Sequence, residues 1–157
     1  ERVTINIAGS IALIYRNILI RSTEDIDVID VVPQEIREKH ALLDRLKNRY
    51  KLIIAHTASH YYPRGWENRT TSLGIFGGLE VRLLDPIDLL VAKLFSRREK
   101  DHDDLMEAWP KIDQEAFRNR LIHNTHEHRQ IPNVIDKARL RWKVLTREED
   151  LPPLADH

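Results

Sequence analysis

The segment AGSIALIYRNILIRSTEDIDVID, residues 8–30, decides the expected fold because it joins a glycine–serine turn to a strand that carries two aspartates. Asp25 and Asp27 alternate with isoleucine and valine, so in a strand both carboxylates project from one face. Two carboxylates a few ångströms apart repel each other, and a divalent cation between them removes that cost. The alternative is an exposed edge strand whose outer face carries acids, since the D-x-D spacing alone is common.

The patterns around this segment predict strands and helices in alternation. Strands are indicated by β-branched residues that alternate or cluster, and helices by apolar positions that repeat along one side. The expected strands are 3–9, 25–32, 51–56 and a hairpin within 72–84, and the expected helices are 10–19 and 33–50. This β-α-β-α-β order indicates a fold of the α/β (α+β) class, with a small mixed sheet flanked by helices.

The chain changes character near residue 85, where Asp85 and Pro86 provide a helix cap and a first-turn proline. A helical pattern follows to about residue 109, and two further helices are expected at 113–123 and 132–147. We therefore expect an α/β core over residues 1–84 and a helical C-terminal extension over residues 85–157, packed on that core.

The composition excludes several classes of protein. The 25 basic and 25 acidic residues balance, so the net charge gives no indication of a nucleic-acid partner. The sequence has no cysteine, which excludes disulfides and thiolate sites. No apolar run approaches the about 20 residues of a membrane helix, so we expect a cytoplasmic protein without a membrane partner. Because the chain starts at Glu1 and enters a strand at once, we expect a short segment to precede it.

The ordered motifs resemble the polymerase-β-like nucleotidyltransferase superfamily. Its signature is a hydrophobic-Gly-Ser turn, a helix, and then Asp-hydrophobic-Asp, which correspond here to AGS at 8–10 and TEDIDV at 23–28. The stretches YYPRGWENRTT (61–71) and LLDPIDLLVAKLFSRREKDHDDL (83–105) further resemble a prokaryotic branch of small nucleotidyltransferases. That branch is related to the abortive-infection-type toxins of toxin–antitoxin pairs.

The resemblance assigns roles to the N-terminal motifs. It implies that Gly9 and Ser10 help to hold a triphosphate, and that Asp25 and Asp27 bind Mg²⁺ or Mn²⁺. The superfamily usually adds a third carboxylate from a later strand, as a base or a metal ligand. We expect Glu80 in that role because its neighbours alternate inward; a solvent-facing glutamate beside an arginine is the alternative.

The predicted helix after Pro86 carries a polar stripe of Lys93, Arg97 and Asp101 at spacings of four. By itself this stripe indicates a solvated face with ion pairs along the helix. The resemblance instead implies that Lys93 neutralises phosphate charge and that Asp101 positions or activates the acceptor hydroxyl. Arg97 would assist in binding the nucleotide.

The resemblance implies transfer of a nucleotidyl group from a nucleoside triphosphate to a hydroxyl, either at a tRNA 3′ end or on a protein. A toxin–antitoxin role with a cognate partner would fit the same branch. The alternatives are a catalytically inactive module that keeps the fold for binding or regulation, and a metal-dependent nuclease, which also uses clustered carboxylates.

Overall fold

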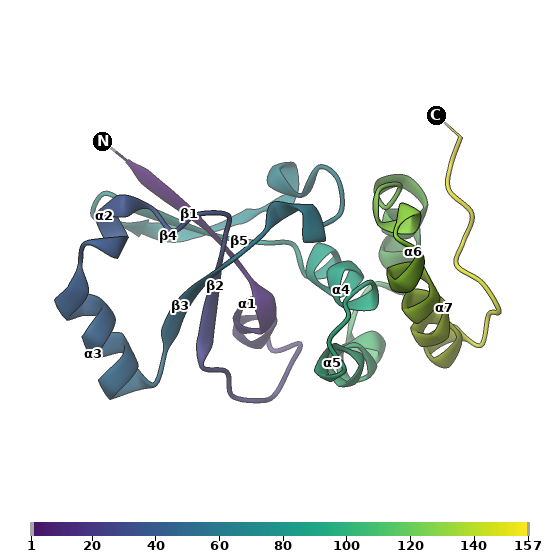
Figure 1. Ribbon diagram of the computed structural model, residues 1–157, viewed down its shortest axis with the longest axis horizontal. Coiled ribbons are helices and arrows are strands. Elements are labelled where there is room, and N and C mark those ends of the chain that lie inside the picture. The colour runs from purple at the N-terminus through teal and green to yellow at the C-terminus, as the bar shows by residue number, and fades with distance from the viewer. Residues whose placement is uncertain (1, 157) are drawn as a thin grey trace. The chain divides into compact units, whose positions relative to one another are not determined.

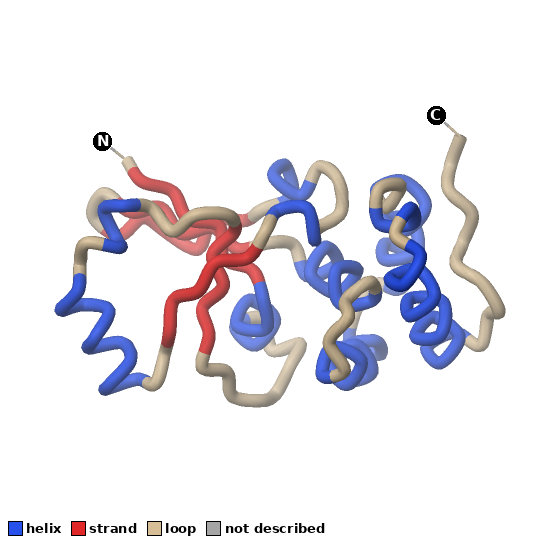
Figure 2. The backbone as a smooth tube through the Cα atoms, viewed as in Figure 1, coloured by secondary structure: helices blue, strands red, loops and turns tan. Residues whose placement is uncertain are grey.

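The computed structural model describes residues 2–156 and contains a five-stranded sheet in the order β3-β2-β1-β5-β4 (Figures 1 and 2). Two strand pairs, β1–β5 and β2–β3, are parallel, whereas β1–β2 and β4–β5 are antiparallel. The strands are β1 (Val3–Ala8), β2 (Asp25–Ile29), β3 (Ile53–Thr57), β4 (Thr71–Phe76) and β5 (Leu79–Leu83). This confirms the expected α/β class with a small mixed sheet.

The helices are shorter and more interrupted than the sequence pattern suggests. They are α1 (Gly9–Tyr15), α2 (Gln34–Arg37), α3 (His40–Tyr50), α4 (Pro86–Leu94), α5 (Lys100–Ala108), α6 (Gln114–Asn124) and α7 (Pro132–Thr146). The helix expected over 33–50 is divided into α2 and α3, and the helical stretch after residue 85 is divided into α4 and α5. None of the helices within residues 2–156 combines the length and apolar character that crossing a membrane requires.

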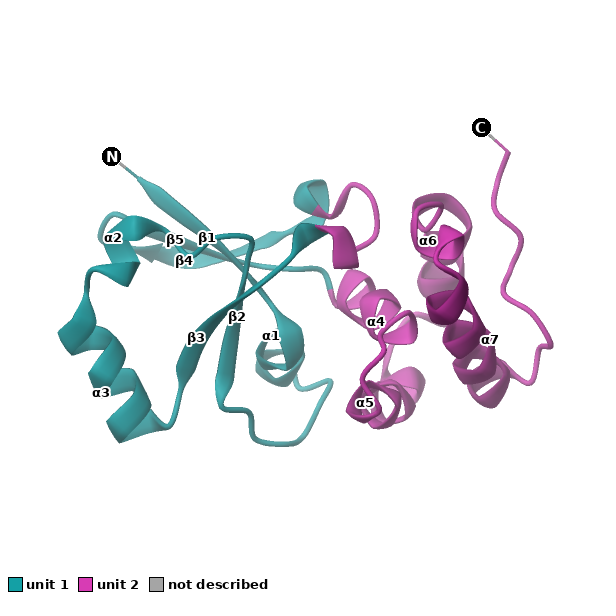
Figure 3. Cartoon of the chain, viewed as in Figure 1, with its two compact units in different colours: residues 1–59, 67–85 teal, residues 60–66, 86–157 magenta. Residues whose placement is uncertain are grey.

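The chain divides into two compact units (Figure 3). The first comprises residues 1–59 and 67–85 and contains the sheet with α1, α2 and α3. The second comprises residues 60–66 and 86–157 and contains α4 to α7. The units therefore meet in sequence at Asp85–Pro86, but the segment 60–66 between β3 and β4 belongs to the helical unit.

The sheet unit has apolar side chains on both faces of its central strand. On one face, Ile5, Val28 and Val81 form a buried cluster, against which Ile36 of α2 packs. Ala8 at the end of β1 is fully buried, as are two side chains of α1, Ala12 and Leu13. Burial of these α1 side chains holds the turn at Gly9 in a fixed place at the end of β1.

The helical unit is organised around an aromatic group formed by Trp109, Phe117 and Trp142. The rings of Phe117 and Trp142 are stacked with centroids 6.1 Å apart, and Trp109 meets each of them edge-on. Trp142 is fully buried, and its Nε1 donates to Glu148 Oε2 at 2.8 Å. These contacts fix α7 against α6 and so determine where the polar side chains of α7 lie.

Candidate functional site

The glycine–serine turn and the second aspartate of β2 meet at the end of β1. In the antiparallel register of β1 and β2, Ala8 is opposite Asp27, so the residue after Ala8 lies beside the Asp27 side chain. Gly9 has a φ of +71°, and a β-carbon built on it would lie 2.1 Å from Asp27 Oδ2. Only glycine permits both this backbone conformation and so close an approach of the carboxylate.

Asp25 and Asp27 lie on the same face of β2, as their spacing requires. Asp25 is exposed and Asp27 is half-buried against Gly9. Within residues 2–156, histidine, aspartate and glutamate side chains form no group of three or more that could hold a metal ion. A pair of carboxylates nevertheless fits Mg²⁺, which usually takes one or two carboxylates and fills its other positions with water and substrate phosphates.

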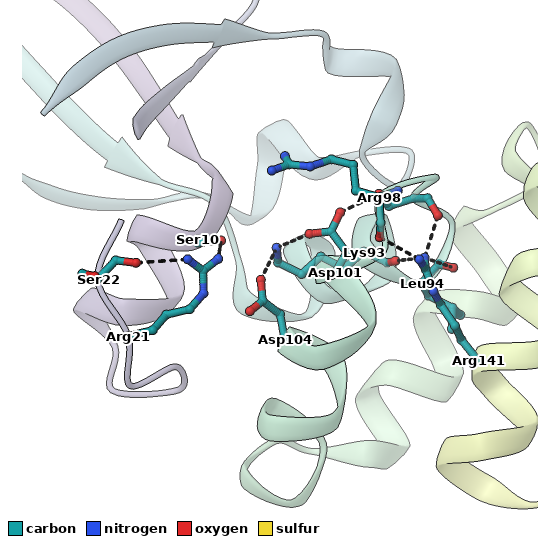
Figure 4. A network of polar contacts seen from close by, with 10 residues as sticks. Ser10, Arg21, Ser22, Lys93, Leu94, Arg98, Asp101, Asp104 and Arg141 are labelled. Atoms are coloured by element: carbon teal, nitrogen blue, oxygen red, sulfur yellow. Dashed lines mark hydrogen bonds and ion pairs between the residues drawn. The ribbon is translucent and has the colours of Figure 1, made fainter. Parts of the chain in front are cut away.

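A guanidinium group that the sequence motifs did not reveal lies at the same turn. Arg21 Nη2 donates to Ser10 Oγ at 2.5 Å, and Arg21 Nη1 donates to the carbonyl oxygen of Ser22 at 3.1 Å (Figure 4). Arginine binds phosphate oxygens through two parallel N–H donors, and a hydroxyl can add a third. Arg21 is therefore a candidate phosphate ligand beside Ser10. Its position eleven residues after Ser10 carried no periodic signal because the chain between them leaves the helix at Tyr15.

Glu80 lies at a different level of the sheet from the aspartate pair. It pairs in register with Thr4, whereas Asp27 pairs with Ala8, and four residues of strand span roughly 13 Å. Glu80 does share the face of Asp27, because Thr4 and Ala8 lie on one side of β1. Its Oε1 is 3.0 Å from Arg82 Nη1. The register does not bring Glu80 to Asp27, and its role as a third metal ligand stays a prediction.

The helical unit contains a second polar cluster, formed by Lys93, Asp101, Asp104 and Ser96 (Figure 4). Lys93 Nζ donates to Asp101 Oδ1 at 2.8 Å and to Asp104 Oδ2 at 2.9 Å. Ser96 Oγ donates to the other oxygen of Asp101 at 2.5 Å. The exposed fractions are 8% for Lys93 and 4% for each aspartate, so this is a buried cluster with one more acid than base.

The sequence pattern did not predict the contact between Lys93 and Asp101. The two residues were expected on one helix, two turns apart. In the structure they lie on α4 and α5, and the chain between the helices folds back so that the side chains meet directly. Arg97 lies in this connection with an exposed side chain, and its carbonyl oxygen accepts from Lys137 Nζ at 3.0 Å. Its role in nucleotide binding stays a prediction.

Residues 1–149 match the model of a protein family that is described as a nucleotidyltransferase of unknown function, DUF6036. The match covers the turn, the aspartate pair and the buried lysine cluster described above. No curated protein matches the chain, and no solved structure matches it.

Proposed function

The chain belongs to the DUF6036 family of nucleotidyltransferases, and from that premise we propose that it transfers a nucleotidyl group from a nucleoside triphosphate to a hydroxyl group. In this reaction the hydroxyl oxygen forms a bond to the α-phosphorus, the bond from that phosphorus to the β-phosphate oxygen breaks, and pyrophosphate leaves. The acceptor hydroxyl belongs to an RNA, such as a tRNA 3′ end, or to a protein side chain.

One observation carries this proposal: the Asp27 carboxylate lies directly against Gly9 in the glycine–serine turn. A nucleoside triphosphate that carries a divalent cation needs carboxylates for the cation and an anion-binding group for its phosphates close together. Within the sheet unit, the glycine–serine turn after β1 supplies the anion-binding group, and β2 supplies the carboxylates. The alternative of an exposed edge strand does not apply, because β2 lies between β3 and β1 in the sheet.

Each group in the sheet unit has a role in this reaction. Asp25 and Asp27 would hold the metal, and Ser10 and Arg21 would donate hydrogen bonds to the phosphates. Mg²⁺ or Mn²⁺, when bound there, stabilises the negative charge that develops on the phosphate oxygens. Because Arg21 already donates to Ser10 Oγ, both groups are oriented before the nucleotide arrives.

For Lys93 and Asp101, which belong to the helical unit, the proposal keeps the roles that the resemblance implies. The Lys93 ammonium is the positive charge assigned to the phosphates, and Asp101 is the carboxylate assigned to the acceptor hydroxyl. Both oxygens of Asp101 already accept a hydrogen bond, one from Lys93 and one from Ser96, so this role would use the remaining lone pairs of the carboxylate. A role in a toxin–antitoxin pair with a cognate partner protein is part of the same proposal.

Calorimetry tests the binding half of this proposal. ATP, CTP, GTP and UTP are titrated into the protein with and without Mg²⁺, and into the variants Asp25→Asn and Asp27→Asn. We expect at least one nucleotide to bind in a magnesium-dependent manner, and each variant to weaken that binding about tenfold or more. Glu24→Gln is the matched control, because Glu24 is an exposed acid next to the pair.

Incubation with labelled tRNA and with protein acceptors tests the chemistry. Lengthening of the tRNA, or labelling of a protein by the nucleotide, supports transfer. Shortening of the tRNA would instead indicate a metal-dependent nuclease. Absence of nucleotide binding under all conditions would identify the chain as an inactive module that retains the fold.

A further inference from the structure

The guanidinium of Arg141, from the middle of α7, is surrounded by main-chain carbonyl oxygens where α4 ends. Nη1 donates to the carbonyl oxygens of Lys93 at 2.7 Å, Leu94 at 3.2 Å and Ser96 at 2.6 Å, and Nη2 donates to that of Arg98 at 2.8 Å (Figure 4). Only 4% of Arg141 is exposed. One side chain therefore binds the backbone of four residues that are 43 to 48 positions away in sequence.

These contacts provide hydrogen-bond donors for carbonyl oxygens at and after the C-terminal end of α4. The last carbonyl groups of a helix have no partner within the helix and carry partial negative charge, which a cation stabilises. The connection between α4 and α5 contains neither glycine nor proline, and its one local turn contact is the hydrogen bond from Arg98 N–H to Ser96 Oγ at 3.0 Å. Arg141 supplies donors from a distant part of the chain, in addition to the backbone N–H groups of Ser96 and Asp101, which donate to the carbonyl oxygens of Lys93 and Arg98. Burial lowers the pKa of Arg141, an effect that the carboxylates of Asp101 and Glu99 partly oppose. An arginine side chain keeps its positive charge in proteins.

The residues that Arg141 binds include the two whose side chains hold Asp101. Lys93 presents its carbonyl oxygen to Arg141 and its ammonium to Asp101, and Ser96 presents its carbonyl oxygen to Arg141 and its hydroxyl to Asp101. Each oxygen of the Asp101 carboxylate thus accepts from a side chain, of Lys93 or Ser96, whose own carbonyl oxygen is bound by Arg141.

We propose that Arg141 is a positioning residue that sets the geometry of Lys93 and Asp101 for nucleotidyl transfer, an inference that rests on the proposed function. It does not itself contact the reacting atoms. A purely structural arginine would stabilise α7 against α4 without affecting how Lys93 and Asp101 meet. The two roles differ in whether loss of Arg141 alters the Lys93 side chain and the rate of the chemical step.

Arg129 provides a matched control for this comparison. It also binds backbone carbonyl oxygens in the helical unit, with Nη1 donating to Pro152 at 2.6 Å and Nη2 donating to Leu121 at 2.8 Å. These contacts, together with the one from Nε to Thr125 Oγ1 at 3.2 Å, involve neither Lys93 nor Asp101. Arg141→Lys and Arg129→Lys therefore both keep a positive charge and both lose hydrogen bonds to carbonyl oxygens. Thermal unfolding of each variant measures the loss of stability.

The first measurement is the reactivity of Lys93 toward an amine-acylating reagent, followed by mass spectrometry. In the wild type we expect slow modification, since the ammonium is buried between two carboxylates. We expect faster modification of Lys93 in Arg141→Lys and wild-type behaviour in Arg129→Lys, both measured well below the unfolding temperature. Equal modification of Lys93 in both variants would overturn the proposal.

The second measurement is steady-state nucleotidyl transfer. We expect Arg141→Lys to lower kcat between about tenfold and a hundredfold with little change in KM for the nucleotide, because displaced catalytic groups affect the transition state more than binding. An unchanged kcat in Arg141→Lys would overturn the proposal. If the wild type transfers no nucleotide to any acceptor, the proposed function fails, while the acylation comparison still decides whether Arg141 positions Lys93.

A milder variant keeps the proposal testable should Arg141→Lys fail to fold. Ser96→Ala preserves the carbonyl contact to Arg141 and removes the hydroxyl that donates to Asp101 and accepts from the N–H of Arg98. We expect a lower kcat and faster acylation of Lys93 in this variant. Wild-type values for both would show that the geometry held by Arg141 at Ser96 does not reach Asp101.

Discussion

The carboxylate of Asp27 lies against the α-carbon of Gly9, so close that a β-carbon at position 9 would come within 2.1 Å of Oδ2. We therefore expect Gly9→Ala to displace Asp27 and to weaken magnesium-dependent nucleotide binding about tenfold or more. The variant also forces alanine into a left-handed conformation, at a cost of about 1–2 kcal/mol. Calorimetry and thermal unfolding of the same sample separate these two effects.

Gly77→Ala is the control for that experiment. Gly77 also has a positive φ, +64°, but nothing lies within 4 Å of the position its β-carbon would take. This variant should show the conformational cost alone and should bind nucleotide like the wild type. Equal nucleotide affinity in both glycine variants would contradict a close packing of Asp27 on the turn.

Removal of the Lys93 ammonium should destabilise the helical unit. Lys93→Met leaves the buried carboxylates of Asp101 and Asp104 without the cation they share, and such losses typically cost about 3–5 kcal/mol. The double variant Lys93→Met/Asp104→Asn removes one of the two negative charges and should recover part of that stability. Chemical denaturation of the single and double variants measures the coupling, and simple additivity would argue against a shared cluster.

A second buried ion pair connects α4 to α6. Asp88 is fully buried and binds the Arg120 guanidinium. We expect Asp88→Ala to lower the free energy of unfolding by about 3 kcal/mol or more. Glu149→Ala is the comparison, because it breaks an exposed pair with Lys143 and should cost less than about 1 kcal/mol. Similar losses from the two substitutions would mean that burial of Asp88 does not set the cost.

Stability of the helical unit should decrease in mild acid because of His128. Its Nε2 donates to the carbonyl oxygen of Tyr61 at 3.0 Å, and its Nδ1 is buried without a hydrogen-bond partner among the described residues. Burial lowers the pKa of His128 below its ordinary value near 6.5. The unfolded chain therefore takes up a proton that the folded chain resists, so the stabilisation is complete above about pH 6.5 and is lost as pH falls below it.

Urea denaturation between pH 8 and pH 5 measures this effect. His128→Gln can keep a donor toward Tyr61 but does not titrate, so its midpoint should fall less steeply with acid than that of the wild type. His123→Gln is the control, since His123 is exposed in the same unit. A wild-type pH slope in His128→Gln would assign the acid sensitivity to other groups.

Much of the fold follows from local sequence patterns. The alternating residues of β1 and β5 and the turn at Gly77–Gly78 are local signals, and the structure has strands and a turn at those places. The first-turn prolines of α4 and α7 act in the same way. Local patterns succeed here because each element is stabilised mainly by features of its own residues.

The division between α4 and α5 could not be predicted in this way. The connection has helix-compatible residues, and the break is stabilised by Arg141, which is 43 positions from the nearest carbonyl it binds. The approach of Arg21 to Ser10 is equally non-local, because an irregular stretch after α1 determines it. Residue spacing placed Lys93 and Asp101 on one polar stripe but did not predict that they are in contact, because the contact arises where the chain folds back between α4 and α5.

The passage of residues 60–66 into the helical unit affects how the chain can be divided. Tyr62 and Trp66 of this segment are buried, and the carbonyl oxygen of Tyr61 holds His128. A fragment that begins after Asp85 would lack residues 60–66, which belong to the helical unit although they lie between β3 and β4 in sequence. Each unit therefore consists of two separate stretches of the chain. Limited proteolysis between β5 and α4 should not release a fragment that folds on its own.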